Sequence, residues 1–371
     1  MSVPPLLKIE NMKTYFHSKG RQAFIRSVDG VSFEIRRGET LGVVGESGSG
    51  KSVMALSVMG LVGAAPGVIA GRIALKTDGV QKNLLQDLDD YVERVEADDR
   101  VVEVRKDVVG WQKNVERLMA MVRGKAVAMI FQNPKSSLNP FLSVGRQITE
   151  AIRLHTPCKG KAESRERALY WLERVRMDSP RLRYDNYPRA LSGGMCQRAM
   201  VAMALSCEPS FLIADEPTTG LDATIQSRIA DLLAELKADL GVTTMLISHD
   251  IGIIRRLSDS VAVMYGGMVV EYGPAGKVMA AGPESGHPYT AALLASVPDE
   301  RNIRGKEPLQ AIPGDVPDAM HVPDGCRFYG RCVRVTAAIE RECAQRLPPL
   351  SDVAPGHAVR CWRFGGSDGN R

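Results

Sequence analysis

The chain has 371 residues, of which 44% are hydrophobic and 25% charged; this is the composition of a globular protein and excludes wholesale disorder. At about 150 residues per domain, the length predicts two compact units. The net charge of +5 comes from 48 basic and 43 acidic residues mixed along the chain. Because no basic stripe can track a phosphate backbone, nucleic acid is not a predicted partner.

The N-terminal stretch MSVPPLLKIE lacks the basic, apolar and cleavage regions of a secretory signal, so we expect a cytoplasmic protein. Residues 6–44 alternate short apolar runs with turns, which predicts several strands. The last of these, LGVV, leads into a glycine-rich loop. Strands followed by strand–helix alternation predict an α/β fold with a parallel sheet covered by helices.

The glycine-rich loop fits the pattern G-x-x-x-x-G-K-[ST] and is followed at once by a helical apolar pattern. In such a loop, backbone N–H groups converge on phosphate oxygens at a helix N-terminus. The lysine reaches the β- and γ-phosphates, and the final hydroxyl binds Mg²⁺. The predicted ATP-binding residues here are Gly45, Glu46, Ser47, Gly48, Ser49, Gly50, Lys51 and Ser52.

Residues 52–70 carry no charge and are nearly long enough to span a bilayer. Because they contain three glycines and a proline and begin inside the phosphate-loop motif, we interpret them as a buried helix followed by a loop. Residues 87–107 differ from their surroundings, with nine acidic and four basic residues. A solvated insertion is the simpler interpretation, and a regulatory or partner-binding segment is the alternative.

Further along, apolar residues at helical spacing predict helices over 163–176 and 222–240. Short apolar runs predict strands at 211–214, 244–247 and 261–264. The first of these strands ends in Asp215 and Glu216, and ligands bind at the carboxyl ends of parallel strands. Asp215 is the candidate Mg²⁺ ligand, and Glu216 is the candidate base that polarises the attacking water.

The segment LSGGMCQR, at 191–198, resembles the signature loop of ABC ATPases. Other landmarks of that family follow in order: Gln132 in MIFQNP, Asp222 in GLDA and His249 in LISHD. The resemblance implies that Gln132 and His249 act with Glu216 in hydrolysis, that Gln132 also binds Mg²⁺, and that Phe16 stacks on adenine, with Tyr15 as the alternative. It also implies that nucleotide binding involves Ser192, Gly193, Gly194, Gln197 and Asp222.

The same resemblance implies a P-loop NTPase fold of ABC type. It has a parallel-sheet core, an N-terminal antiparallel β subdomain and a helical signature subdomain over about 134–205. We expect this nucleotide-binding domain to cover 1–285, with an insertion over about 80–118, and a small loop-rich C-terminal extension over 286–371. The signature loop of one subunit would contact ATP held by the opposite subunit, so that ATP joins a head-to-tail dimer.

The stretches MIFQNPKSSLNPFLSVGRQI, HPYTAALLASVP and IPGDVPDAMHVPDGCRFYGRC resemble the ATPases of dipeptide and oligopeptide importers. The resemblance implies two transmembrane permease subunits, a second ABC ATPase, an extracytoplasmic solute-binding protein, and a place at the cytoplasmic face of the bacterial inner membrane. Importers of nickel, glutathione or sugar derivatives share this subfamily, and a non-transport ABC ATPase is a more distant alternative.

Four cysteines crowd the C-terminal end: Cys326, Cys332, Cys343 and Cys361. In a reducing cytoplasm, clustered thiols favour a metal over disulfides. They are separated by 5, 10 and 17 residues, wider than the paired C-x₂₋₄-C spacing of structural zinc sites. We therefore expect a [4Fe–4S] cluster, as the subfamily resemblance also suggests, with zinc and unligated thiols as alternatives.

Overall fold

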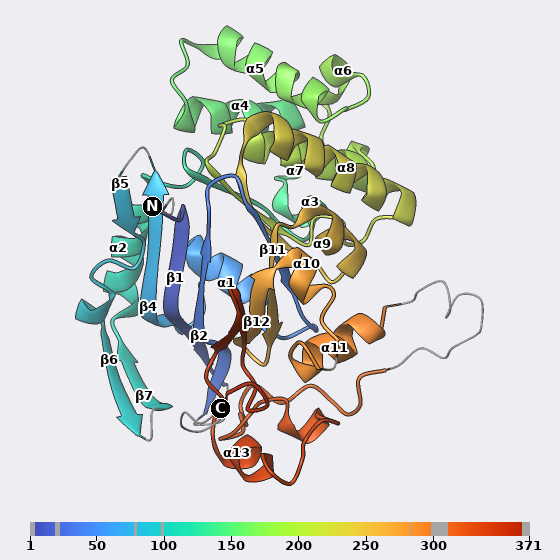
Figure 1. Ribbon diagram of the computed structural model, residues 1–371. Helices are drawn as coiled ribbons and strands as arrows, with labels where there is room; N and C mark the ends of the chain where they lie inside the picture. Colours follow the sequence, from blue (N-terminus) through green and yellow to red (C-terminus); the bar gives the residue numbers. More distant parts are fainter. Residues whose placement is uncertain are drawn as a thin grey trace, which may run out of the picture.

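The computed structural model describes residues 4–18, 23–77, 80–97, 100–282, 284–297 and 311–365. Figure 1 shows a layered arrangement, with helices gathered at the top, β-sheets in the middle and the C-terminal segment at the bottom. The predicted α/β fold of ABC type is confirmed by the elements described next.

The N-terminal sheet has four antiparallel strands in the order β2-β1-β4-β5. Residues 52–70 divide between a helix and the start of the third strand, so the alternative of a membrane span is wrong. Among the described residues, no helix is both long and apolar enough to cross a bilayer. The strands are β1 (Leu7–His17), β2 (Phe24–Ile35), β4 (Pro66–Thr77) and β5 (Val80–Asn83).

The central sheet has eight strands in the order β13-β14-β12-β11-β3-β10-β9-β8, of which the last five run parallel. Every residue of these five is buried, as expected for a parallel sheet covered on both faces. The three strands predicted between 211 and 264 are confirmed. The five are β3 (Thr40–Val44), β8 (Val127–Ile130), β9 (Phe211–Asp215), β10 (Thr243–Ile247) and β11 (Ser260–Tyr265).

Helices follow these strands, and several begin with a side chain that caps the first turn. Asp222 and Asp250 each accept a hydrogen bond from the backbone N–H three residues on, at 3.0 and 3.1 Å. The helix predicted at the start of 52–70 and those predicted over 163–176 and 222–240 are confirmed, with small shifts at their ends. Those beside the sheet are α1 (Lys51–Val58), α8 (Ala223–Leu240), α9 (Ile251–Leu257) and α10 (Ala275–Val278).

A further group of helices lies between Pro134 and Leu205, and those over 144–185 are at the top of Figure 1. Their buried faces form one hydrophobic cluster that includes Trp171, Leu172 and Met200. The group consists of α3 (Pro134–Ser137), α4 (Val144–His155), α5 (Lys161–Arg174), α6 (Pro180–Asp185), the short 3₁₀ turn η2 (Pro188–Ala190) and α7 (Gly193–Leu205).

The acidic insertion is folded. After β5 it forms a 3₁₀ turn, an antiparallel hairpin and a helix beside the N-terminal sheet (Figure 1). Trp111, Val115 and Met119 are buried in the same hydrophobic cluster as β1 and α1. Within 87–107 itself, Leu88, Val92, Val101 and Val104 are buried in this cluster, so the interpretation of that stretch as simply solvated is wrong for its apolar residues. The elements of the insertion are η1 (Leu88–Asp90), β6 (Val92–Ala97), β7 (Arg100–Lys106) and α2 (Val108–Met119).

The hairpin is attached to β4 and not to the phosphate loop, since Arg94 and Lys106 each donate at 2.5 Å to a β4 carbonyl oxygen. Replacing residues 93–105 with a short Gly-Ser turn should therefore leave the affinity for MgATP within a few-fold. The melting temperature should fall by roughly 5 to 10 °C, because buried Val101 and Val104 are lost from the core. Thermal unfolding and nucleotide titration measure both quantities.

The exposed Val102→Ser variant in the same hairpin is the matched control and should change neither quantity. Loss of MgATP binding by a hairpin deletion that still folds would refute the assignment of the insertion to a region remote from the nucleotide.

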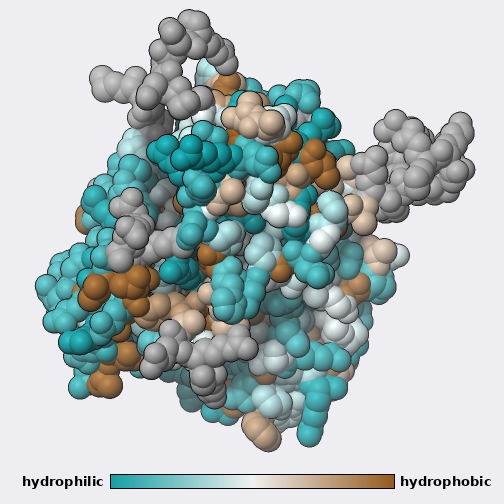
Figure 2. All heavy atoms as spheres, turned by 90° about the horizontal axis from the view of Figure 1, so that it is seen from below, coloured by the Kyte–Doolittle hydropathy of each residue, from teal (hydrophilic) through white to brown (hydrophobic). Residues whose placement is uncertain are grey.

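The C-terminal segment is loop-rich, as predicted, yet it shares the central sheet. Its strand β14 pairs antiparallel with β12, and β13 pairs with β14 and forms the edge of the sheet. Seen from below, hydrophilic residues cover most of the molecule, and hydrophobic ones form small separate groups (Figure 2). The remaining elements are β12 (Met268–Pro274), α11 (Pro288–Ala295), η3 (Tyr329–Arg331), α13 (Glu340–Gln345), β13 (Ser351–Ala354) and β14 (His357–Val359).

Candidate functional site

The predicted phosphate loop connects the end of β3 to α1, and two of its glycines allow close backbone approaches. A Cβ on Gly50, whose φ is +95°, would lie 2.0 Å from the Ser27 carbonyl oxygen. A Cβ on Gly45 would lie 2.2 Å from that of Met264. No side chain fits at these distances, so glycine is required for the loop to pack against β2 and β11.

Lys51 is 6% exposed and folds back across the loop. Its Nζ donates to the carbonyl oxygens of Gly45 and Glu46 at 2.8 and 2.9 Å, and to Ser49 Oγ at 3.3 Å. Burial lowers the pKa of this ammonium, while the carboxylates of Glu216, Asp215 and Glu46 oppose the shift. The positive charge of Lys51 is thus held against the backbone of the phosphate loop, where a phosphate chain would bind.

Ser52 and Asp215 lie together beside the loop, with Ser52 Oγ donating to Asp215 Oδ1 at 3.0 Å. Burial raises the pKa of the Asp215 carboxyl, the nearby Glu216 charge adds to this shift, and the Ser52 hydrogen bond opposes it. A buried carboxylate next to a hydroxyl is a set of hard oxygen donors of the kind that Mg²⁺ prefers. These residues therefore fit the predicted magnesium site.

Glu216 follows directly at the end of β9, with a φ of +46° that is uncommon for a residue other than glycine. Its Oε2 accepts hydrogen bonds from Gln132 Nε2 and Thr219 Oγ1, both at 2.8 Å, and lies 3.4 Å from His249 Nδ1. Gln132 follows β8 and His249 follows β10, so three parallel strands bring the three predicted catalytic residues together.

The signature residues lie at the N-terminus of α7. Ser192 is exposed and caps the helix by accepting from Met195 N at 3.3 Å, while Gly193 and Gly194 are partly exposed in its first turn. Gln197 is only 1% exposed, and its Nε2 has no hydrogen-bond partner among the described residues. The structure thus buries Gln197 away from the surface where Ser192 lies.

The exposed fractions of the side chains bear on the predicted adenine contact and on the predicted role of Asp222. Tyr15 is buried, and its hydroxyl donates to Asp29 Oδ1 at 2.5 Å, so it is not free to stack on adenine. Phe16 is half-buried on the opposite face of β1. Asp222 is exposed and caps α8, at the start of the helix that follows the acidic strand.

Two side chains that the sequence did not single out also hold the phosphate loop. The backbone N–H of Glu46 donates to the Tyr289 hydroxyl at 2.8 Å, and Arg331 makes two hydrogen bonds to the Glu46 carboxylate. Tyr289 lies in the HPYT stretch, which was notable only as a mark of the subfamily. Nothing in the sequence pattern around Arg331 indicates its partner.

The four C-terminal cysteines line one small cavity together with Phe328 and Trp362. Burial raises the pKa of Cys326 to about 12 and that of Cys343 to about 11, and the neighbouring cysteines add to both shifts. Within the described ranges, however, no three or more His, Cys, Asp or Glu side chains form a group that could hold a metal ion. The expected iron–sulfur cluster is therefore not supported by the arrangement as it stands.

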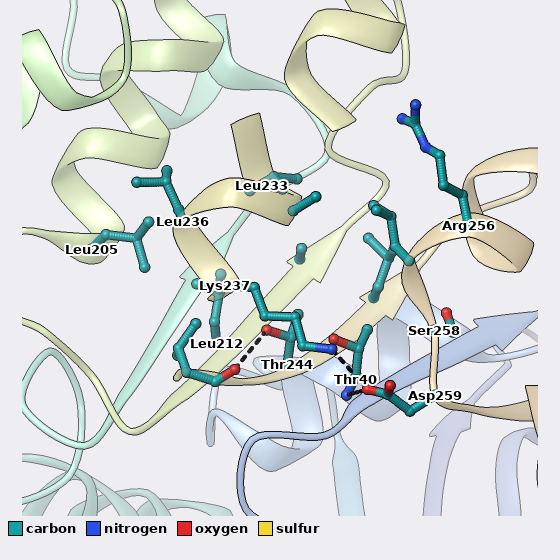
Figure 3. A pocket seen from close by; sticks show the side chains of 15 residues that line it. Thr40, Leu205, Leu212, Leu233, Leu236, Lys237, Thr244, Arg256, Ser258 and Asp259 are labelled. Carbon is teal, nitrogen blue, oxygen red and sulfur yellow. Dashed lines mark hydrogen bonds and ion pairs between the residues drawn. The ribbon is translucent and has the colours of Figure 1, made fainter. Parts of the chain in front are cut away.

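A cavity of about 230 Å³ lies elsewhere, between α8, β10 and the α9–β11 connection (Figure 3). Asp259 Oδ2 at its edge accepts from Lys237 Nζ and from the Thr40 backbone N–H, both at 2.7 Å. Thr40 and Thr244 lie near the start of their strands, whereas the phosphate loop follows the end of β3. The cavity extends from this edge along the face of the sheet that α8 covers, and its lining includes none of the predicted nucleotide-site residues.

A phosphate loop at the end of one parallel strand, with an acidic pair, a glutamine and a histidine at the ends of three others, defines an ATP-hydrolysing cassette. The family described as "ABC transporter" matches residues 28–219, and the family described as "Oligopeptide/dipeptide transporter, C-terminal region" matches residues 270–338. The chain belongs to the ABC transporter family, as one of its ATPases, which use ATP and Mg²⁺.

Curated relatives cover almost the whole chain. It is 41% identical to the probable peptide ABC transporter ATP-binding protein y4tR of Sinorhizobium fredii, over 96% of this chain and 95% of that one. It is also 41% identical to the oligopeptide transport ATP-binding protein AppD of Bacillus subtilis, over 97% of each chain.

Solved structures agree on the fold. An ATP-binding cassette in a dimeric, post-hydrolysis state with ADP and phosphate matches with a TM-score of 0.55, at 23% identity over 72% of this chain and 98% of that one. A cassette from a Clostridium perfringens ABC transporter complex matches with a TM-score of 0.54, at 28% identity over 75% of this chain and 92% of that one.

Proposed function

We propose that this chain binds and hydrolyses ATP to drive the import of dipeptides or oligopeptides across a bacterial membrane. The observation that carries the proposal is the match of residues 270–338 to the C-terminal region of oligopeptide and dipeptide transporters. The nucleotide site alone would not suffice, because cassettes of other functions share it. Relatives whose names include peptide transport support the same solute class.

In this proposal, the phosphate loop and Lys51 bind the phosphates of ATP, and Phe16 stacks on adenine. Ser52, Asp215 and the side-chain oxygen of Gln132 would hold Mg²⁺, which when bound neutralises phosphate charge. Glu216 would accept a proton from the attacking water, and His249 would hold the Glu216 carboxylate and the γ-phosphate in place. The convergence of Gln132, Glu216 and His249 supports these roles.

ATP would also join two cassettes. Ser192, Gly193 and Gly194 form the N-terminus of a 13-residue helix, and such a terminus attracts anions. Their exposure leaves them accessible to the γ-phosphate held by a second cassette, with Asp222 beside the same interface. The second cassette would be a copy of this chain or a related ATPase. Hydrolysis would then remove the contact and let the cassettes separate.

Partners in the membrane follow from the transporter family, and the structure suggests where they dock. Phe141 is 84% exposed in the loop between α3 and α4, shortly after Gln132. An exposed aromatic ring in the loop that follows Gln132 along the chain is suited to pack against permease helices. We propose that two transmembrane permease subunits contact this loop at the cytoplasmic face of the membrane. An extracytoplasmic solute-binding protein would deliver the peptide to them.

Uptake of a labelled dipeptide by cells that carry or lack this chain tests the proposed solute. We expect uptake to require the chain and to be competed by unlabelled dipeptides and tripeptides. Competition by nickel, glutathione or a sugar derivative, with none by peptides, would assign the importer to an alternative solute of the subfamily. Normal uptake of all these solutes without the chain would instead favour a non-transport ABC ATPase.

We further propose that Cys326, Cys332, Cys343 and Cys361 hold a [4Fe–4S] cluster that fastens the C-terminal segment, with zinc or free thiols as alternatives. Support comes from the four thiols lining one cavity and from their chemistry, since iron ligation would stabilise thiolates that burial alone disfavours. The sulfur atoms would have to draw closer together than they lie here, given that no described group could hold a metal ion as arranged.

Protein purified without oxygen should then be brown, absorb broadly at about 400 nm and contain about four irons per chain. Cys332→Ser should lose the colour and the iron, whereas Cys158→Ser, at a cysteine outside this cavity, should keep both. Iron-free protein in which all four C-terminal thiols titrate freely would remove the cluster, and one bound zinc per chain would replace it by the zinc alternative.

A further inference from the structure

The phosphate loop is held from outside the nucleotide-binding core by one arginine of the C-terminal segment. Arg331 Nη1 and Nη2 donate to the two carboxylate oxygens of Glu46 at 2.7 and 3.1 Å. The arginine side chain is 7% exposed and that of Glu46 22%. A paired, largely buried contact of this kind fixes both position and orientation, unlike an exposed ion pair.

Arg331 is itself held in place by other contacts. Its Nε donates to the Pro313 carbonyl oxygen at 2.7 Å, and its Nη1 also donates to the Tyr265 hydroxyl at 3.2 Å. The guanidinium lies 5.7 Å from the centre of the Tyr265 ring and 6.0 Å from that of Phe328. The position of the guanidinium is therefore set by the C-terminal segment and by β11.

Glu46 connects this arginine directly to the phosphate-binding lysine. While its carboxylate accepts from Arg331, its backbone N–H donates to the Tyr289 hydroxyl and its carbonyl oxygen accepts from Lys51 Nζ at 2.9 Å. All three polar groups of Glu46 are thus in use. A shift of Glu46 would move the carbonyl that orients Lys51 and change the shape of the loop.

A second arginine from the same turn reaches the adenine side of the site. Arg327 forms an ion pair with Asp29 and donates to the Gly266 carbonyl oxygen. Asp29 in turn accepts from Tyr15, the residue before Phe16 on β1. The C-terminal segment therefore contacts the phosphate loop directly and is linked through Asp29 of β2 to Tyr15, the neighbour of the proposed adenine-stacking residue.

We propose that Arg331 is a positioning residue for ATP binding, which holds Glu46 so that the phosphate loop is preorganised, and that the C-terminal segment thereby sets the nucleotide affinity of the cassette. The inference rests on the proposed ATP site. Preorganisation acts through the cost of ordering the loop, so its loss should weaken binding more than it slows the chemical step.

The test is MgATP binding and hydrolysis by full-length Arg331→Ala in the assembled transporter. We expect affinity to fall about tenfold, the usual result of removing a charge-assisted hydrogen bond. KM should rise with it, while kcat stays within about threefold. Arg331→Lys keeps the charge but not the paired geometry, so its MgATP affinity should lie between those of Arg331→Ala and the wild type.

Arg341→Ala is the matched control, since this exposed arginine of α13 donates to Gln345 of the same helix. The variant should bind MgATP as wild type does. If Arg331→Ala does not fold, Glu46→Ala removes the same contact from the other side and should also weaken binding. Pairing Glu46→Arg with Arg331→Glu should restore part of the affinity.

Wild-type affinity in Arg331→Ala, with only a lower melting temperature, would overturn the inference and leave the arginine a purely structural role. Failure of the wild-type protein itself to bind MgATP would instead overturn the proposed ATP site. The two failures are therefore distinguishable.

Discussion

Glu216→Gln should lower ATP hydrolysis by about 10²-fold or more in the assembled transporter while leaving ATP binding intact. The amide cannot accept the proton of the attacking water, yet it has nearly the same shape as the carboxylate. Its oxygen can still accept the hydrogen bonds from Gln132 and Thr219. Since ATP would then persist between the two cassettes, the variant should also accumulate as a closed dimer in the presence of ATP.

Single-turnover hydrolysis and size-exclusion chromatography with ATP measure the two effects. Glu208→Gln, at an exposed glutamate in the loop before β9, is the matched control and should behave as wild type. Hydrolysis at the wild-type rate by Glu216→Gln would show that another group activates the water.

Lys51→Ala should weaken MgATP binding by one to two orders of magnitude. Hydrogen bonds to charged groups contribute about 1.5–3 kcal/mol, and each 1.4 kcal/mol is about tenfold in affinity. Lys51 is also buried, and its ammonium group donates to two backbone carbonyl oxygens of the phosphate loop. Without it, those carbonyl oxygens would face the phosphates and repel them.

Equilibrium titration with a fluorescent ATP analogue measures this loss, with Lys161→Ala, at the exposed first residue of α5, as the control. A folded Lys51→Ala protein with unchanged affinity would contradict the assignment of this loop as the phosphate site.

The meeting of the candidate nucleotide-site residues could be predicted from the sequence because they occur in short contiguous motifs at the ends of apolar strands. Asp215 is the last residue of a strand whose five residues are all buried, and Glu216 follows it directly. Lys51 begins a helix after a glycine-rich turn. In a parallel sheet, such ends meet at one edge. The position of Gln132, Glu216 and His249 after three apolar runs was therefore enough to predict that these side chains lie close together.

Contacts that depend on distant segments could not be predicted in the same way. Arg331 and Glu46 are 285 residues apart, and no periodic pattern connects them. The C-terminal strands β13 and β14 are short, and neither the pairing of β14 with β12 nor that of β13 with β14 gives a sequence signal. In the insertion, high charge masked the apolar residues, such as Trp111, that bury one of its faces.

The most direct test of the account is ATP hydrolysis by the chain reconstituted with its permease partners in liposomes, with and without a peptide-loaded solute-binding protein. We predict hydrolysis that requires Glu216 and that rises when the peptide-loaded protein is added. A preparation that contains both permeases and this chain, yet hydrolyses no ATP under either condition, would contradict the central claim that this chain powers a peptide importer.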